Sequence, residues 1–170
     1  LGRIRTTADG CFGIKVQPKQ LLAVLPRDAG GGARFLQNFE KIVVLTRRDK
    51  LGQAISGSIA DETGKWFSDG SEAVLDDSKL AALCPDVAFK LNRYIVEERL
   101  MLDAAQRSGK PVLHLEYEEI LGDPDAVFNR VLGFLGEPCG VAGVEEDAAV
   151  PVPSKPKGKT AQRLRTMFLD

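Results

Sequence analysis

Apolar and polar positions form blocks that predict strands alternating with helices. A β-branched apolar run over residues 42–45 ends in polar residues, as a buried parallel strand does. Apolar residues at spacings of three and four follow it and predict an amphipathic helix that ends at Gly64. Further blocks predict strands over residues 11–16 and 111–116, and helices over 20–25, 86–108, 125–135 and 161–169. This alternation predicts a single α/β domain over residues 1–170 with a parallel sheet.

Glycine, proline and acidic residues set the expected limits of these elements. Pro85 is expected to precede the long helix, and Asp123 to cap the helix that Gly136 ends. Residues 28–33 contain three consecutive glycines without the Lys-Ser/Thr of a P-loop, and predict a flexible loop. Residues 65–77 predict another loop, in which Trp66 either lines an acceptor pocket or closes the edge of the core.

Net charge, apolar runs and cysteine number limit the kinds of partner and compartment that the sequence predicts. The formal net charge of −1 over 170 residues argues against a nucleic-acid partner, and no apolar run approaches the length of a membrane span. Cys11, Cys84 and Cys139 are odd in number and lack the spacing of a zinc site, which predicts free thiols and a cytoplasmic protein. The chain opens on LGRIRTTADG, without Met or a signal peptide, so we expect a further segment upstream of Leu1.

The strongest chemical signal lies where the strand over 42–45 meets its helix. Arg47 and Arg48 stand at that junction, and ligands of open α/β sheets bind at the carboxyl ends of strands. The start of a helix favours anions, and arginine binds a phosphate through two parallel hydrogen bonds. The pattern predicts an anion or phosphate site, with two solvated arginines that pair with Asp49 and nearby carboxylates as the alternative.

Two other features carry less specific signals. His114, the only histidine, lies within a predicted strand and is expected to be structural rather than a general base. Lys155, Lys157 and Lys159 form a basic run around a glycine, which is either a solvated tail or a strap over a bound anion.

Residues 45–66, LTRRDKLGQAISGSIADETGKW, resemble a stretch of the sulfotransferases, most closely the bacterial trehalose-type enzymes. In that family this strand–loop–helix binds the 3′-phosphate of 3′-phosphoadenosine 5′-phosphosulfate through an arginine and a serine eight residues later. Arg48 and Ser56 have this spacing. A serine two turns along a helix faces the same way as the residues near its start, so both side chains can reach one phosphate.

Two further stretches are similar to the family. Residues 12–17, FGIKVQ, resemble the strand that runs toward the sulfonate, with Lys15 at the family's lysine and Gln17 where relatives have a catalytic histidine. Because an amide cannot act as a general base, the resemblance implies a carboxylate base upstream of Leu1. Residues 112–138, VLHLEYEEILGDPDAVFNRVLGFLGEP, resemble a fold signature of the family rather than a site.

The resemblance implies a P-loop NTPase-like parallel sheet flanked by helices, in the C-terminal two-thirds of a longer chain. The family's phosphosulfate-binding loop, Pro-Arg-Ser-Gly-Ser/Thr, does not occur in the sequence and is expected upstream. The implied reaction transfers a sulfonate from 3′-phosphoadenosine 5′-phosphosulfate to a hydroxyl of a sugar, glycolipid or related small molecule. Arg48, Ser56 and Lys157 would bind this co-substrate and Lys15 would face the reacting end, without a metal ion. A homodimer would fit the family.

Two other functions fit parts of the pattern. One is a small-molecule kinase on a P-loop-like sheet, although the sequence has no Walker A motif. The other is a non-catalytic nucleotide-binding or scaffold domain with the sulfotransferase fold, which Gln17 and the lack of a phosphosulfate loop favour. The acceptor does not follow from a fold-level likeness.

Overall fold

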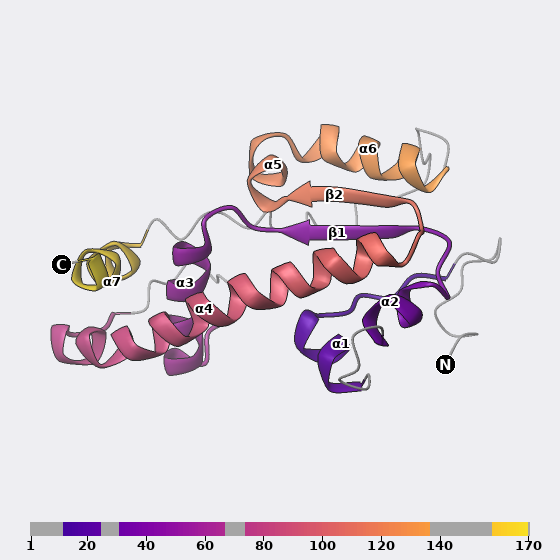
Figure 1. Ribbon diagram of the computed structural model, residues 1–170. Helices are drawn as coiled ribbons and strands as arrows, with labels where there is room; N and C mark the ends of the chain where they lie inside the picture. The colour runs from indigo at the N-terminus through magenta and orange to yellow at the C-terminus, as the bar shows by residue number, and fades with distance from the viewer. Residues whose placement is uncertain (1–11, 25–30, 67–73, 137–157, 170) are drawn as a thin grey trace.

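A computed structural model describes residues 12–24, 31–66, 74–136 and 158–169, and it confirms an α/β chain with a parallel pair of strands. The elements are α1 (Pro18–Val24), α2 (Gly31–Leu36), β1 (Ile42–Thr46), α3 (Lys50–Thr63), α4 (Asp77–Arg107), β2 (Val112–Glu116), α5 (Tyr117–Gly122), α6 (Pro124–Leu135) and α7 (Lys159–Leu169). Figure 1 shows the two strands between the long helix α4 and the pair α5–α6.

β1 and β2 pair in parallel, with a register that runs from Ile42↔Val112 to Thr46↔Glu116. Ile42 and Val44 are buried and pack against Ala105 of α4, so α4 covers this face of β1. Val43 and Leu45 on the other face are exposed, so the prediction of a buried strand is correct for one face only. Both strands therefore end at the same edge of the sheet. The loop from β1 to α3 and the junction of β2 with α5 meet there (Figure 1).

A second core joins α3, α4 and α7, helices that lie together at the end of the molecule beyond the strand tips (Figure 1). Its fully buried side chains include Ile55, Leu80, Val87 and Leu164. Burial of each contributes roughly 1.5–3 kcal/mol to the free energy of folding. The C-terminal helix α7 is thus part of the core that holds α3 in place.

The long helix begins earlier than its sequence predicts, because α4 starts at Asp77 and carries Pro85 in its interior. The Asp76 carboxylate caps the helix by accepting a hydrogen bond from the Lys79 N–H, 2.9 Å. A proline inside a helix costs roughly 3 kcal/mol. Leu80 and Leu83 before Pro85 and Val87 after it are buried in the same core, and their burial offsets that cost.

The prediction of a loop over residues 28–33 is wrong from Gly31 onward, because α2 begins at this residue. Gly31 is buried, and a Cβ on Gly32 would lie 3.1 Å from the Cβ of Ala104. Gly32 therefore allows α2 to approach α4 closely. Gly30 lies outside the described residues.

The predicted strand over residues 11–16 is also wrong where it is described. Phe12 forms a single bridge, and residues 13–17 have no regular secondary structure. Phe12 and Ile14 are 43% and 48% exposed, so this run does not bury the apolar face that stabilises a strand. Trp66 is 62% exposed, which excludes the prediction that it closes the edge of the core.

We predict that Gly57→Ala destabilises the protein through a collision between α3 and α4. A Cβ at Gly57 would lie 2.8 Å from the Tyr94 hydroxyl, and overpacking of this kind costs roughly 1–3 kcal/mol. Removal of that hydroxyl by Tyr94→Phe should relieve the collision. Alanine should then stabilise α3 by up to about 1 kcal/mol relative to glycine. Urea unfolding of both single variants and the double variant measures this coupling, and additive effects would contradict it.

Candidate anion site at the carboxyl ends of the strands

The loop between β1 and α3 consists of Arg47, Arg48 and Asp49. Asp49 caps α3, since its carboxylate accepts a hydrogen bond from the Gly52 N–H at 2.9 Å. A Cβ at Gly52 would collide with this carboxylate, so the glycine makes room for the cap. The cap holds Arg48 one residue before it, at the positive end of a 14-residue helix.

Glu118 of α5 holds the backbone of this loop. Its carboxylate accepts one hydrogen bond from the Arg48 N–H, 3.0 Å, and another from the Asp49 N–H, 3.1 Å. Burial alone would raise the pKa of Glu118, but these two backbone hydrogen bonds lower it below its ordinary value. The loop N–H groups that would otherwise face an incoming anion are therefore paired with a carboxylate of the protein itself.

The Arg48 side chain reaches across to the end of β2. Its Nε donates to Glu116 Oε2 at 3.0 Å, and its Nη2 contacts the same oxygen. The hydrogen bond with Glu116 and the charge of that residue raise the pKa of Arg48. The Arg48 side chain is nevertheless 69% exposed, so the guanidinium is accessible to a ligand from solvent.

Two further arginines contribute to this site, Arg47 from the loop itself and Arg165 from α7. The Arg47 guanidinium lies over the Tyr117 ring, 5.0 Å from its centroid, which is a cation–π contact. Arg165 of α7 pairs with the Asp49 carboxylate at 3.2 Å, and 116 positions separate these residues in the sequence. The loop thus brings together three arginines with three acidic side chains, Asp49, Glu116 and Glu118.

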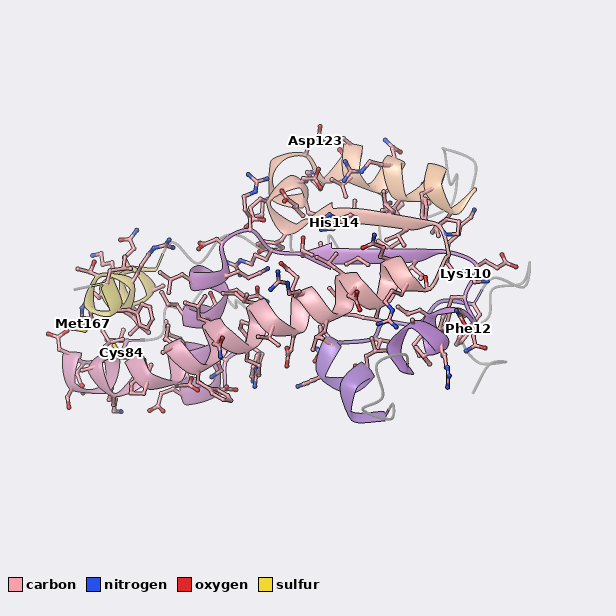
Figure 2. The ribbon with its side chains drawn as sticks, in the orientation of Figure 1. Phe12, Cys84, Lys110, His114, Asp123 and Met167 are labelled. Atoms are coloured by element: carbon pink, nitrogen blue, oxygen red, sulfur yellow. The ribbon has the colours of Figure 1, made fainter. Side chains whose placement is uncertain are left out.

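The structure does not bring the other predicted site residues into contact with Arg48. The Ser56 hydroxyl donates to the Gly52 carbonyl at 2.8 Å, so Ser56 and Arg48 bind different partners. Lys15 is exposed, and no described contact joins it to Arg48. Figure 2 shows Phe12, three residues earlier in the chain, toward the amino ends of the strands. Lys157 lies outside the described residues.

His114 lies on β2 (Figure 2), and its ring contacts a side chain of the neighbouring strand β1. Its Nε2 lies 2.7 Å from the Thr46 hydroxyl, which also donates to the Leu115 carbonyl at 3.3 Å.

Cys84 is a free thiol, and the other two cysteines fall outside the described ranges.

Sequence reasoning missed Glu116, Glu118 and Arg165. The first two belong to a stretch that we interpreted as a fold signature rather than as part of a site. Glu116 is the last residue of the predicted strand over 111–116, and Glu118 follows it by two residues. This position was the available signal, because the carboxyl ends of parallel strands meet at one edge of a sheet. Arg165 gave no such signal, since its contact depends on how α7 packs.

In the part of the chain that the structure describes, no group of three histidine, cysteine, aspartate or glutamate side chains is arranged to hold a metal ion. None of the described helices combines the length and apolarity needed to cross a bilayer.

Comparisons of the chain with models of protein families, with curated proteins and with solved structures found no match.

We predict that the Asp49 cap outweighs the Asp49–Arg165 pair in stability. Asp49→Ala removes both, and loss of a cap costs roughly 1 kcal/mol. Asp49→Asn keeps a capping oxygen and loses only the charge on an exposed pair, which is worth at most about 1 kcal/mol and often nothing measurable. Urea midpoints should fall clearly more for the alanine variant. Equal losses would show that the charge dominates.

A pH dependence follows from Glu119, beside this loop. Hydrogen bonds from the Arg130 guanidinium and the Glu116 N–H lower the pKa of Glu119 from 4.5 to about 2. A carboxyl group with a lowered pKa stabilises the folded state above its unfolded pKa, and this contribution disappears as the pH falls through the folded pKa. The difference in urea midpoint between wild type and Arg130→Gln should therefore shrink between pH 4.5 and pH 2. A difference in urea midpoint that stays constant over this pH range would show that the Glu119–Arg130 pair does not stabilise the folded state.

Proposed function

We propose that this chain belongs to a sulfotransferase that uses 3′-phosphoadenosine 5′-phosphosulfate and has a P-loop NTPase-like sheet. The acceptor would be a hydroxyl of a sugar, glycolipid or related small molecule. The observation that carries the proposal is the exposed Arg48 guanidinium at the carboxyl ends of two parallel strands, one residue before the cap of α3. The sulfotransferase-like spacing of Arg48 and Ser56 supports the identity of the ligand.

In this proposal the site binds the 3′-phosphate of the co-substrate. The guanidinium of Arg48 donates two hydrogen bonds to the phosphate, as arginine does in bidentate phosphate recognition. Ser56, two turns along α3, turns its half-buried hydroxyl from the Gly52 carbonyl to the phosphate. Lys157 contributes a further positive charge from the basic run that ends at Lys159. These contacts hold the co-substrate by its 3′-phosphate, whereas the reacting sulfonate is attached to its 5′-phosphate.

The reaction would be an in-line displacement at sulfur. The acceptor oxygen forms a bond to sulfur while the bond from sulfur to the 5′-phosphate oxygen breaks, and 3′-phosphoadenosine 5′-phosphate leaves. A base takes the proton of the acceptor hydroxyl, and we assign that base to no residue of this chain. Catalysis would come from positioning and from positive charge near the leaving oxygen, with Lys15 as the candidate cation.

We predict that the protein binds 3′-phosphoadenosine 5′-phosphate more tightly than adenosine 5′-phosphate, and that Arg48→Ala removes this preference. Loss of a charged hydrogen bond to the 3′-phosphate costs roughly 1.5–3 kcal/mol, about ten- to a hundred-fold in affinity. Calorimetric titration of both nucleotides against wild type and variant measures the difference.

Arg107→Ala is the matched control for this titration. It also removes one arginine charge, but Arg107 pairs with Asp103 at the end of α4 that leads to the amino end of β2. Its affinities should stay near those of wild type. A folded wild-type protein that binds the two nucleotides equally, or binds neither, would contradict the proposal.

Nucleotide binding without sulfonate transfer is the second candidate function. Gln17 favours it, because the amide stands where sulfotransferase relatives have a histidine base and cannot accept the proton of the acceptor. Preference for the 3′-phosphorylated nucleotide without transfer to any of a panel of sugars and glycolipids would support this function instead.

A further inference from the structure

Glu116 and Glu118 approach the same loop from consecutive elements, but they contact different parts of it. Glu116 ends β2 and pairs with the side chain of Arg48, whereas Glu118 lies in the first turn of α5 and binds backbone N–H groups. The Glu116 contact is therefore with the group that recognises a ligand. Glu118 instead contacts the loop backbone from which the Arg48 side chain extends.

The Arg48–Glu116 pair lies at the surface. The two side chains are 69% and 34% exposed, and one oxygen of Glu116 receives the hydrogen bonds of both Nε and Nη2. Surface ion pairs of this kind contribute little net free energy, because water screens them and both side chains lose rotamer freedom. A phosphate that carries more charge than a carboxylate is therefore able to displace Glu116 from Arg48.

The Glu118 contact is of another kind. Both of its oxygens accept hydrogen bonds from successive backbone N–H groups, at 3.0 and 3.1 Å, beside the start of α3. These bonds do not depend on where the Arg48 side chain points. They hold the loop whether the guanidinium is paired with Glu116 or with a ligand.

We propose that Glu116 competes with the anionic ligand for Arg48, and that Glu118 is the positioning residue that keeps the loop in place in both states. This inference rests on the proposed function, because the ligand is taken to be the 3′-phosphate of the nucleotide. It assigns opposite effects to two carboxylates that stand two residues apart. Glu116 lowers the affinity for the ligand, and Glu118 raises it.

The test compares Glu116→Gln with Glu118→Gln. Each variant keeps the shape of the side chain and removes one negative charge beside the same loop. The long-range electrostatic attraction of the loop for an anion therefore rises similarly in both variants. Calorimetric titration with 3′-phosphoadenosine 5′-phosphate should show about three- to five-fold tighter binding to Glu116→Gln. Binding to Glu118→Gln should be weaker than to wild type by a similar factor or more, with a reduced preference over adenosine 5′-phosphate.

Thermal unfolding without ligand separates a positioning role from general destabilisation. Glu118→Gln should still unfold cooperatively, and the loss of affinity should persist at temperatures well below its unfolding midpoint. Tighter binding of the nucleotide to both variants would overturn the role of Glu118 and leave only a charge effect. Weaker binding to Glu116→Gln would overturn the competition and show that Glu116 orients Arg48, with the ligand on the opposite edge of the guanidinium.

Failure of the proposed function gives a different result. Wild type would then bind the two nucleotides equally or bind neither, and inorganic pyrophosphate would serve as the anionic probe. Tighter binding of pyrophosphate to Glu116→Gln than to wild type, abolished by the additional change Arg48→Ala, would support the competition without a nucleotide site. Equal affinity of wild type and Glu116→Gln for pyrophosphate would overturn it.

Discussion

Parallel pairing of β1 with β2, in the register that aligns Thr46 with Glu116, is the constraint on which the rest of the structure depends. Since both strands end at the same edge, the residues that follow Thr46 meet the residues that follow Glu116, and Arg48 contacts Glu118 across 70 positions of sequence. A slip of the register along the strands would separate these contacts. The helices α3 and α4 lie in the connection between the strands, and α4 covers one face of β1.

At this edge the structure separates the support of the loop from the chemistry of its side chains. Glu118 binds backbone N–H groups, and Asp49 caps α3, so the path of the chain is held by contacts that leave the Arg48 guanidinium out. The Arg48 guanidinium pairs at the surface with Glu116, the one carboxylate that contacts it among the described residues. An arginine held in this way can exchange partners while the start of α3 stays in place.

The elements that the sequence predicted correctly are those with local causes. Apolar runs and periodicity placed β1, β2 and the body of α3, and both Gly64 and Gly136 end their helices in the left-handed conformation. The errors arose where tertiary packing outweighs a local preference. Pro85 is retained inside α4 because the residues on both sides of it are buried in one core.

That Arg48 follows a strand and precedes a helix can be predicted from the residues around it, because the strand pattern, the cap and the helix period all depend on neighbouring residues. The charges that surround this arginine depend instead on the packing of distant elements. Glu116 and Glu118 reach the loop through the register of two strands, and Arg165 reaches Asp49 because α7 packs against α3 and α4. Such contacts depend on how distant elements pack, and no local pattern specifies them.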